Sequence, residues 1–255
     1  MLDDKAVERD RYEGWGRQVL SASAPPPLDG AESLAPILRA PYTFYEQTLG
    51  GLLRPGLQVL ELGAGMGEHT GSLVRSGASV TCLDIAPAAL ETITRRFASG
   101  INPPKTVIGD IESVPLPSAS IDVIVGANFL SYGDPDCVDR EIFRVLKPSG
   151  SLVCLDSLNH NLIYRLNRWR RFCRGERSRS TLLRMPNLSR IHRLSAPFAS
   201  TELRFFGSMA WAVAAIAPFV GQETAALLSD RLDVAVGVRR SAFKFVLVAR
   251  NLRRE

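Results

Sequence analysis

Strand-like segments that alternate with helical segments constrain the fold of this chain more than any other feature. GLQVLEL, ASVTCLD, KTVIGD, SIDVIVGAN and SLVCLDS are typical of strands. Between them lie helical patterns such as APAALETITRRFASG, in which Leu90, Ile93 and Phe97 recur at helical spacing. Strands with long apolar runs, separated by helices, predict a mostly parallel sheet covered on both faces. We therefore expect an α/β, doubly wound fold.

Three glycines follow the first predicted strand on alternate positions, in QVLELGAGMGEHT. Gly63, Gly65 and Gly67 could simply form a tight turn, or they could leave room for a ligand against the backbone, since glycine has no side chain and adopts positive φ at low cost. In doubly wound sheets, ligands bind at the carboxyl ends of the strands, where the strand order reverses. The glycines stand at the first such end.

An acidic residue ends the second predicted strand at the spacing that a nucleoside site requires. Asp84 lies 21 positions after Gly63, and in this architecture an acid about 20 residues after the glycines binds the ribose hydroxyls. A carboxylate suits that role because it can accept hydrogen bonds from two neighbouring hydroxyls. The sequence therefore predicts a nucleoside-binding site. A dehydrogenase is the main rival, but its Gly-x-Gly-x-x-Gly pattern would place the third glycine one position later.

Four successive motifs carry a family resemblance: ELGAGMG, LDIAPAAL, IGDIESVPLPSASIDVIVGANFLSYGDP and IFRVLKPSGSLV. In this order they resemble the motifs of class I methyltransferases that use S-adenosylmethionine, and the style resembles small bacterial methyltransferases (type 11-like) of glycan and natural-product pathways. The closing segment LSDRLDVAVGVRRSAFKFVLVAR resembles the C-terminal helix and final strand of the same group. The resemblance implies a Rossmann-like, mostly parallel seven-stranded sheet with an antiparallel last strand, an N-terminal helical cap and a helical insertion after strand five.

The resemblance also implies a role for individual residues toward S-adenosylmethionine, whose product is S-adenosylhomocysteine. The methionine part would be held by the acid and turn after the first strand: Glu61, Gly63, Ala64, Gly65 and Gly67. Asp84 would bind the ribose, with Ile85 on the adenine. Asp110 would accept from the adenine amino group, with Ile111 beside the ring, and Asn128 would face the methionine part.

We expect one methyltransferase domain over residues 1–255, in four parts. These are a helical cap (1–50), a cofactor-binding core (51–158), a basic helical region on the acceptor side (159–240) and a closing strand (241–255).

Removal of a proton from an acceptor hydroxyl calls for a general base, and His160 is the first candidate because it follows the fifth predicted strand at the carboxyl edge. A packing or capping role for this histidine stays open. No metal site is expected, since Asp134 and Asp136 flank Pro135 in a pattern typical of a turn.

Positive charge is concentrated in one block. The net charge is +5, and residues 165–193 contain ten arginines and one acid, Glu176. In NLIYRLNRWRRFCRGERSRS, Leu162, Leu166, Trp169 and Cys173 would share one face of a helix. Four roles for this helix are open: packing on the sheet edge, binding of an anionic acceptor, docking to an anionic membrane and RNA binding. RNA binding ranks last, and DNA binding is not expected.

Three functions remain open. The first is O-methylation of a small molecule or glycan precursor, such as a sugar nucleotide or a lipid-linked sugar. The others are RNA methylation and a catalytically silent protein that keeps the fold. The N-terminus MLDDKAVERD has no apolar run, so we expect no signal peptide. The four cysteines form no Cys-x-x-Cys pair, so we expect reduced thiols in a cytoplasmic protein, with contact at the inner membrane face as an alternative. The sequence does not indicate an oligomeric state.

Overall fold

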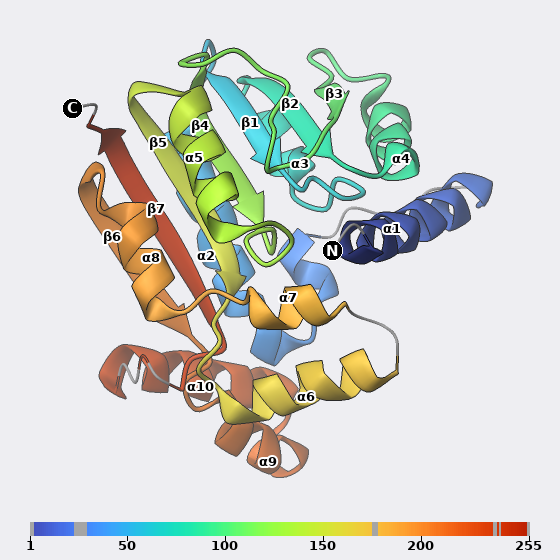
Figure 1. Cartoon of the computed structure of the whole chain (residues 1–255). Helices are drawn as coiled ribbons and strands as arrows, with labels where there is room; N and C mark the ends of the chain where they lie inside the picture. Colours follow the sequence, from blue (N-terminus) through green and yellow to red (C-terminus); the bar gives the residue numbers. More distant parts are fainter. Residues whose placement is uncertain (1–2, 23–29, 175–177, 237–238, 240, 254–255) are drawn as a thin grey trace.

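The computed structural model describes residues 3–22, 30–174, 178–236, 239 and 241–253. These residues form one seven-stranded sheet in the order β3-β2-β1-β4-β5-β7-β6 (Figure 1). The segment SASAPPPLDG, whose prolines and glycine predict a loop, lies mostly in residues 23–29, outside the described part of the chain.

The strands are mostly parallel, as predicted. Their bounds are β1 (Gln58–Leu62), β2 (Ser79–Asp84), β3 (Lys105–Ile108), β4 (Ile121–Ala127), β5 (Leu146–Ser157), β6 (Phe198–Phe206) and β7 (Lys244–Leu252). Strands β1 to β5 pair in parallel, whereas β7 is antiparallel to both of its neighbours, β5 and β6. The predicted fold class, including the antiparallel last strand, is confirmed.

Helices precede the sheet, connect β1 to β2, β2 to β3 and β4 to β5, and flank β6 in the segment between β5 and β7. Before β1 stand α1 (Asp3–Ser21), the short 3-10 helix η1 (Gly30–Ser33) and α2 (Pro36–Leu52). Between strands lie α3 (Thr70–Arg75), α4 (Pro87–Phe97) and α5 (Pro135–Val145). The arginine-rich region holds α6 (Leu162–Cys173), α7 (Arg179–Leu183) and α8 (Leu188–Ser195), and α9 (Ala210–Val220) and α10 (Gln222–Val236) follow β6.

Both faces of the sheet are buried, which explains why its strands are so apolar. Alternate residues point to opposite faces: Leu60 packs on the side of α5 and α8, and Val59 on the side of α2, α3 and α4. In Figure 1, α5 and α8 lie in front of the sheet and α2 lies behind it. Because both faces are mostly apolar, the polar side chains that line a cavity lie near the strand ends.

The segment PDCVDREIFRVLKPSG predicts a helix, and Met209 to about Val236 predicts two helices with a break near Pro218 and Gly221. The end of the first helix differs from the structure, whereas the break agrees with it. We expected the helix of PDCVDREIFRVLKPSG to be stopped by Pro148 and Gly150, but α5 ends at Val145 and the chain is already extended at Leu146. Leu146 pairs with Ile121 of β4, so its backbone is paired in the sheet from that point. The predicted break near 218–221 lies at Gly221, which has φ +85° and separates α9 from α10.

One glycine fits between strands where no larger residue can. A Cβ on Gly126, in β4, would lie 2.6 Å from Phe129 Cδ1 and 2.8 Å from the carbonyl oxygen of Leu62. The carbonyl belongs to the neighbouring strand and cannot move aside. We predict that Gly126→Ala lowers the free energy of unfolding by about 1–3 kcal/mol, measured by urea denaturation.

Gly50 is the matched control, since it lies in α2 and a Cβ there would meet nothing within 4 Å. Gly50→Ala should raise stability by about 0.5–1 kcal/mol because it reduces the chain entropy lost on folding. Equal effects of the two substitutions would contradict the packing described for Gly126.

Candidate active site

The turn after β1 requires its glycines. Gly63, Gly65 and Gly67 have φ of +63°, +54° and +87°, a region that other residues rarely adopt. The turn is closed by a hydrogen bond from the Gly67 N–H to the Ala64 carbonyl at 3.0 Å. It leads into α3, and its backbone faces the carboxyl edge of the sheet.

Asp84 joins this turn to the end of β2. Its carboxylate accepts hydrogen bonds from the backbone N–H groups of Gly65 and Ala86, each at 2.9 Å. The side chain is buried, which raises its pKa, although these backbone hydrogen bonds act in the opposite direction. Asp84 therefore holds the turn and still lines the cavity beside it.

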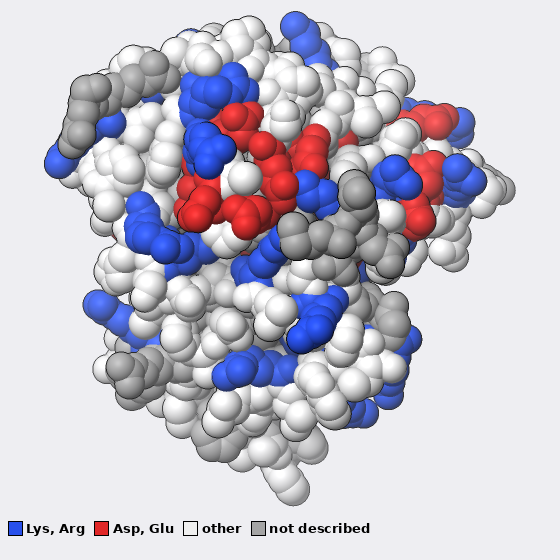
Figure 2. Space-filling model, viewed as in Figure 1, with Lys and Arg blue, Asp and Glu red and all other residues white. Residues whose placement is uncertain are grey.

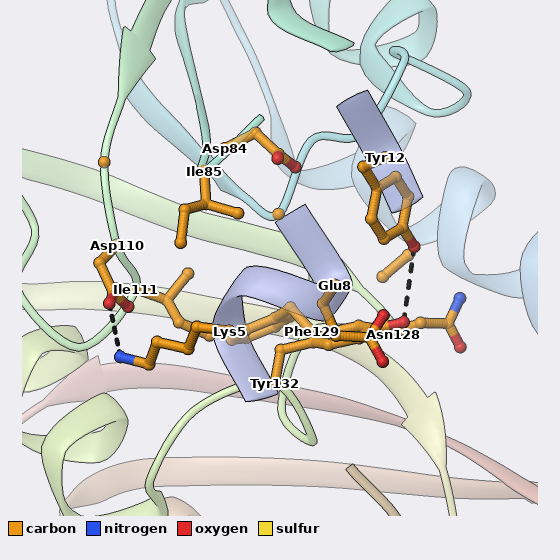
Figure 3. A pocket seen from close by; sticks show the side chains of 13 residues that line it. Lys5, Glu8, Tyr12, Asp84, Ile85, Asp110, Ile111, Asn128, Phe129 and Tyr132 are labelled. Carbon is orange, nitrogen blue, oxygen red and sulfur yellow. Dashed lines mark hydrogen bonds and ion pairs between the residues drawn. The ribbon is translucent and has the colours of Figure 1, made fainter. Parts of the chain in front are cut away.

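The glycine turn, Asp84 and the loops after β3 and β4 enclose a cavity that most of the predicted residues reach (Figure 3). Six predicted side chains or glycines line it, namely Gly63, Asp84, Ile85, Asp110, Ile111 and Asn128. Ala64, Gly65 and Gly67 belong to the adjoining turn but are not part of the lining. The carboxyl edge thus brings together residues far apart in sequence, as the parallel topology predicts.

Glu61 lies beneath the turn rather than in the cavity. Its carboxylate is buried and accepts hydrogen bonds from Thr70 Oγ1 at 2.6 Å and Cys82 Sγ at 3.4 Å. Burial raises its pKa to about 7, against the effect of the Thr70 hydrogen bond. The role toward the methionine part that the resemblance implies for Glu61 stays a prediction.

Helix α1, part of the predicted N-terminal helical cap, closes the cavity from outside, but the sequence did not indicate which of its residues line the cavity. Lys5, Glu8 and Tyr12 of α1 line it, and Lys5 Nζ lies 2.5 Å from Asp110 and 2.6 Å from Glu112. Burial would lower the pKa of Lys5, but the two carboxylates raise it overall. In Figure 3 the Lys5 side chain reaches across to Asp110. No pattern in MLDDKAVERD singles out this contact.

The lining suits a nucleoside. Ile85 and Ile111 form an apolar slot that suits a flat ring. The carboxylates of Asp84 and Asp110 lie on either side of this slot, where each can accept hydrogen bonds. The enclosed space measures about 80 Å³, whereas small-molecule sites usually hold roughly 300 Å³ or more. In this arrangement, α1 and the contact between Lys5 and Asp110 leave little enclosed space beside the slot.

A second, larger cavity of about 590 Å³ lies beside the first. Its walls come from α2, α6, the start of α9 and the start of β7, together with α1. Tyr12, Asn128 and Tyr132 line both cavities, so these side chains mark their junction. Asn128 has φ +61°, and its Nδ2 donates to the hydroxyl of Tyr42 at 3.2 Å.

Two buried cations face the second cavity. Lys244 Nζ donates to Asn128 Oδ1 and lies 3.4 Å from Ser157 Oγ. Arg168, in α6, donates to the Tyr164 hydroxyl at 3.1 Å and to Ser157 Oγ at 3.3 Å. Both cations are buried, and neither forms an ion pair with a carboxylate among the residues that the structure describes. The buried Asp156 carboxylate supplies one opposite charge to these two cations. Because burying an uncompensated charge is costly, the remaining positive charge favours an anionic partner.

The Tyr164 hydroxyl is the centre of this cluster. It lies 2.7 Å from Ser157 Oγ and accepts from Arg168. Burial raises its pKa, but Lys244, Arg168 and these hydrogen bonds lower it more, so the net pKa is below the usual 10. Burial would likewise lower the pKa of Lys244, yet Tyr42, Tyr164 and Asp156 raise it overall. The arrangement stabilises a phenolate beside a cation.

His160 occupies a different place. It lines neither cavity, and its Nε2 accepts a hydrogen bond from the backbone N–H of Leu188 at 3.4 Å, at the start of α8. This is the capping position that the sequence left open, and the catalytic role of His160 stays a prediction. Asp134 caps α5 by accepting from the N–H groups of Asp136 and Cys137.

Comparisons with known proteins agree with this geometry. Residues 60–154 match a family model described as "Methyltransferase domain". Over 110 residues the chain is 34% identical to a malonyl-acyl carrier protein O-methyltransferase of Serratia marcescens, a match covering 42% of each protein. The match thus spans about two fifths of that relative's length.

Solved structures with the same fold cover most of the chain. One is a crystal structure titled as a putative sarcosine dimethylglycine methyltransferase from Galdieria sulphuraria (TM-score 0.56, 21% identity, 84% of this chain and 86% of that chain). Another is a geranyl diphosphate C-methyltransferase from Streptomyces coelicolor with Mg²⁺, geranyl diphosphate and S-adenosyl-L-homocysteine (TM-score 0.59, 16% identity, 85% and 80%). At these identities the likeness concerns the fold.

The buried Glu61 predicts a pH-dependent stability. Its folded pKa of about 7 exceeds the ordinary value of 4.5, so the folded state holds a proton that the unfolded state releases. Stability from this group is complete below about pH 4.5 and is lost as pH rises through 7, by on the order of 3 kcal/mol. Urea denaturation should show that Glu61→Gln is more stable than the wild type at pH 8, with little difference at pH 4.5.

Glu202 is the control, because its side chain is exposed on β6. Glu202→Gln should leave the pH dependence unchanged. A Glu61→Gln variant that is less stable than the wild type at pH 8 would show that the ionised carboxylate stabilises the fold.

Proposed function

Because this chain belongs to the class I S-adenosylmethionine-dependent methyltransferases, we propose that it transfers a methyl group to an oxygen of a small molecule. The junction of the two cavities carries the proposal: Tyr12, Asn128 and Tyr132 line both of them. A cofactor in the first cavity and an acceptor in the second would meet at these side chains. The geometry supports transfer between two small ligands.

On the cofactor side, the residues bind and orient. Asp84 would accept from the ribose hydroxyls, Asp110 from the adenine amino group once Lys5 has moved, and Ile85 and Ile111 would pack on the ring. S-adenosylmethionine supplies a methyl group that is already activated by its bond to a sulfonium. Much of the rate then comes from alignment, since well-oriented reactants gain effective molarities of about 10⁵ M or more.

On the acceptor side, the charge of the cavity indicates the kind of molecule. Lys244 and Arg168 are both buried, and both contact Ser157. Arg168 also contacts Tyr164. Guanidinium and ammonium groups bind carboxylate and phosphate. The apolar side chains of Ile37, Leu38 and Phe243 line the same space. This combination favours an acceptor with an apolar body and an anionic group.

A glycan precursor on a lipid phosphate fits this description better than a sugar nucleotide, whose whole body is polar.

The named relative from Serratia marcescens, an O-methyltransferase, is similar over about two fifths of each chain. The family match ends at residue 154, before Tyr164, Arg168 and Lys244. Selection of the acceptor therefore rests on residues of this chain outside the matched region.

Tyr164 is the general base in this proposal. Its lowered pKa and its contact with Arg168 stabilise the phenolate, which can take the proton of an acceptor hydroxyl as the oxygen is methylated. Lys244 has a raised pKa and remains a cation, so it can hold an anionic group but cannot accept a proton. Tyr164 lines the acceptor cavity together with Asn128 and Lys244.

Cofactor binding is tested by calorimetric titration with S-adenosylhomocysteine, with NADH in parallel. We expect micromolar binding of S-adenosylhomocysteine alone and at least about tenfold weaker binding by Asp84→Asn, because hydrogen bonds to a charged group contribute roughly 1.5–3 kcal/mol. Asp136→Asn is the matched control, since Asp136 lies in α5 and does not line the cavity. Binding of NADH instead would contradict the proposal.

Transfer is tested with labelled S-adenosylmethionine and a panel of lipid phosphates, sugar nucleotides and long-chain carboxylates. With an accepted substrate, the rate should rise with pH and level off at an apparent pKa below 10, because the base acts when deprotonated. Tyr164→Phe should lower kcat by about 10²–10⁴-fold and abolish this rise.

Tyr42→Phe is the control for Tyr164, since the Tyr42 hydroxyl contacts Asn128 in the same cavity. This variant should keep the pH profile. An unchanged profile in Tyr164→Phe would exclude Tyr164 as the base, and cofactor binding without transfer to any acceptor class would favour a silent binding protein.

A further inference from the structure

Helix α6 turns its apolar side chains toward solvent. Leu162, Leu166 and Trp169 are 74%, 58% and 55% exposed. They share one face of the helix, and packing of that face on the sheet edge was one of the roles left open by the sequence. Cys173, on the same face, is exposed as well. A stripe of this kind on a helix surface usually marks a contact with a partner.

The orientation of α6 is fixed by polar contacts on its opposite face. There Tyr164 and Arg168 point inward, and Arg168 is buried between the hydroxyls of Ser157 and Tyr164. With about 100° of rotation per residue, this face is opposite the Leu162–Trp169 stripe. The apolar stripe is therefore held outward by the acceptor-site hydrogen bonds.

Arginines border the stripe on both sides. At about 100° per residue, Arg165 and Arg170 fall roughly 60° and 80° to either side of Leu162, and both are exposed. Figure 2, viewed as Figure 1, shows basic and uncharged side chains over the lower region where α6 lies, while the visible acidic side chains lie higher. Apolar residues between arginines are typical of helices that lie in an anionic membrane interface.

Helix α9 adds an uncharged apolar surface at the same end of the molecule (Figure 1). Its Phe219 is 88% exposed, and Ile216 and Val220 are exposed as well. The acceptor cavity lies between the two helices, because Ile163 of α6 and Ala210 at the start of α9 both line it. A surface that receives α6 and α9 would therefore lie at the mouth of this cavity.

We propose that α6, supported by α9, docks this protein on an anionic phospholipid membrane. Leu162, Leu166 and Trp169 enter the interface, and Arg165 and Arg170 lie at the level of the phosphates. Among the residues that the structure describes, no helix is long and apolar enough to span a bilayer, so the contact is peripheral. The charge of α6 selects a membrane over a second copy of this chain, whose matching surface would carry the same positive charge.

The test is co-sedimentation with vesicles of phosphatidylcholine alone or mixed with phosphatidylglycerol. We expect binding to the mixed vesicles only, weakened by added salt. Arg165→Ala with Arg170→Ala should weaken it about 30-fold, since each arginine near an anionic surface contributes roughly fivefold. Leu166→Ser with Trp169→Ser should weaken it more than about tenfold.

The matched control removes the same kinds of side chain from another part of the surface. Arg95→Ala with Ile101→Ser changes an exposed arginine of α4 and an exposed isoleucine in the loop after it, far from α6 in Figure 1. This variant should bind as the wild type. Circular dichroism checks that every variant is folded, and no methyl acceptor is needed, so failure here is distinct from failure of the proposed activity.

Three outcomes would overturn the proposal. These are no binding to the mixed vesicles, equal binding to both kinds of vesicle, and binding that the α6 variants leave unchanged. Sedimentation velocity supplies a further check: a dimer of the wild type that Trp169→Ser dissociates would assign the stripe to self-association instead.

Discussion

The hydrogen bond from the Gly65 N–H to the Asp84 carboxylate joins the two strand ends on which the cofactor side depends. It fixes the glycine turn against β2, and the same carboxylate then accepts from Ala86 at the start of α4. Through these two hydrogen bonds, Asp84 connects the glycine turn, the end of β2 and the start of α4. Both sheet faces are filled with apolar side chains, and the buried Asp84 carboxylate is accommodated at the strand end because backbone N–H groups there donate to it.

The second cavity, the proposed acceptor site, depends on the reversed direction of one strand, β7. Because β7 runs antiparallel to β5, its first residue, Lys244, pairs with Ser157 at the last position of β5. A parallel β7 would have placed its first residue at the opposite edge of the sheet. The reversal thus brings a lysine from near the end of the chain to the carboxyl edge, beside Asn128 after β4.

The sequence predicted the parts of the site that follow from local spacing. Gly63 and Asp84 each stand at the end of an apolar strand, and in a parallel sheet such ends meet, so their proximity required no knowledge of tertiary contacts. Lys244 was missed although a lysine within the apolar run AFKFVLVAR is a local signal of a buried, partnered charge. The sequence does not show that its partners come from the ends of β4 and β5. The face of α6 shows a further limit. Periodicity indicates which residues share a face of α6. Only the inward contacts of Arg168, on the opposite face, show that the apolar face with Leu166 and Trp169 points outward.

The attachment of α1 gives the cofactor site a built-in competitor. The C-terminal half of α1 is anchored on α4, where Gly16 packs against the backbone of Ala88 and Glu13 accepts from the Ala88 N–H at 2.9 Å. Its N-terminal half covers the site through Lys5. In the proposed function, a nucleoside would compete with the ammonium group of Lys5 for Asp110. The observed dissociation constant equals the intrinsic one divided by the fraction of molecules in which α1 is displaced. Affinity for the cofactor is thus adjustable from a helix that precedes the whole sheet.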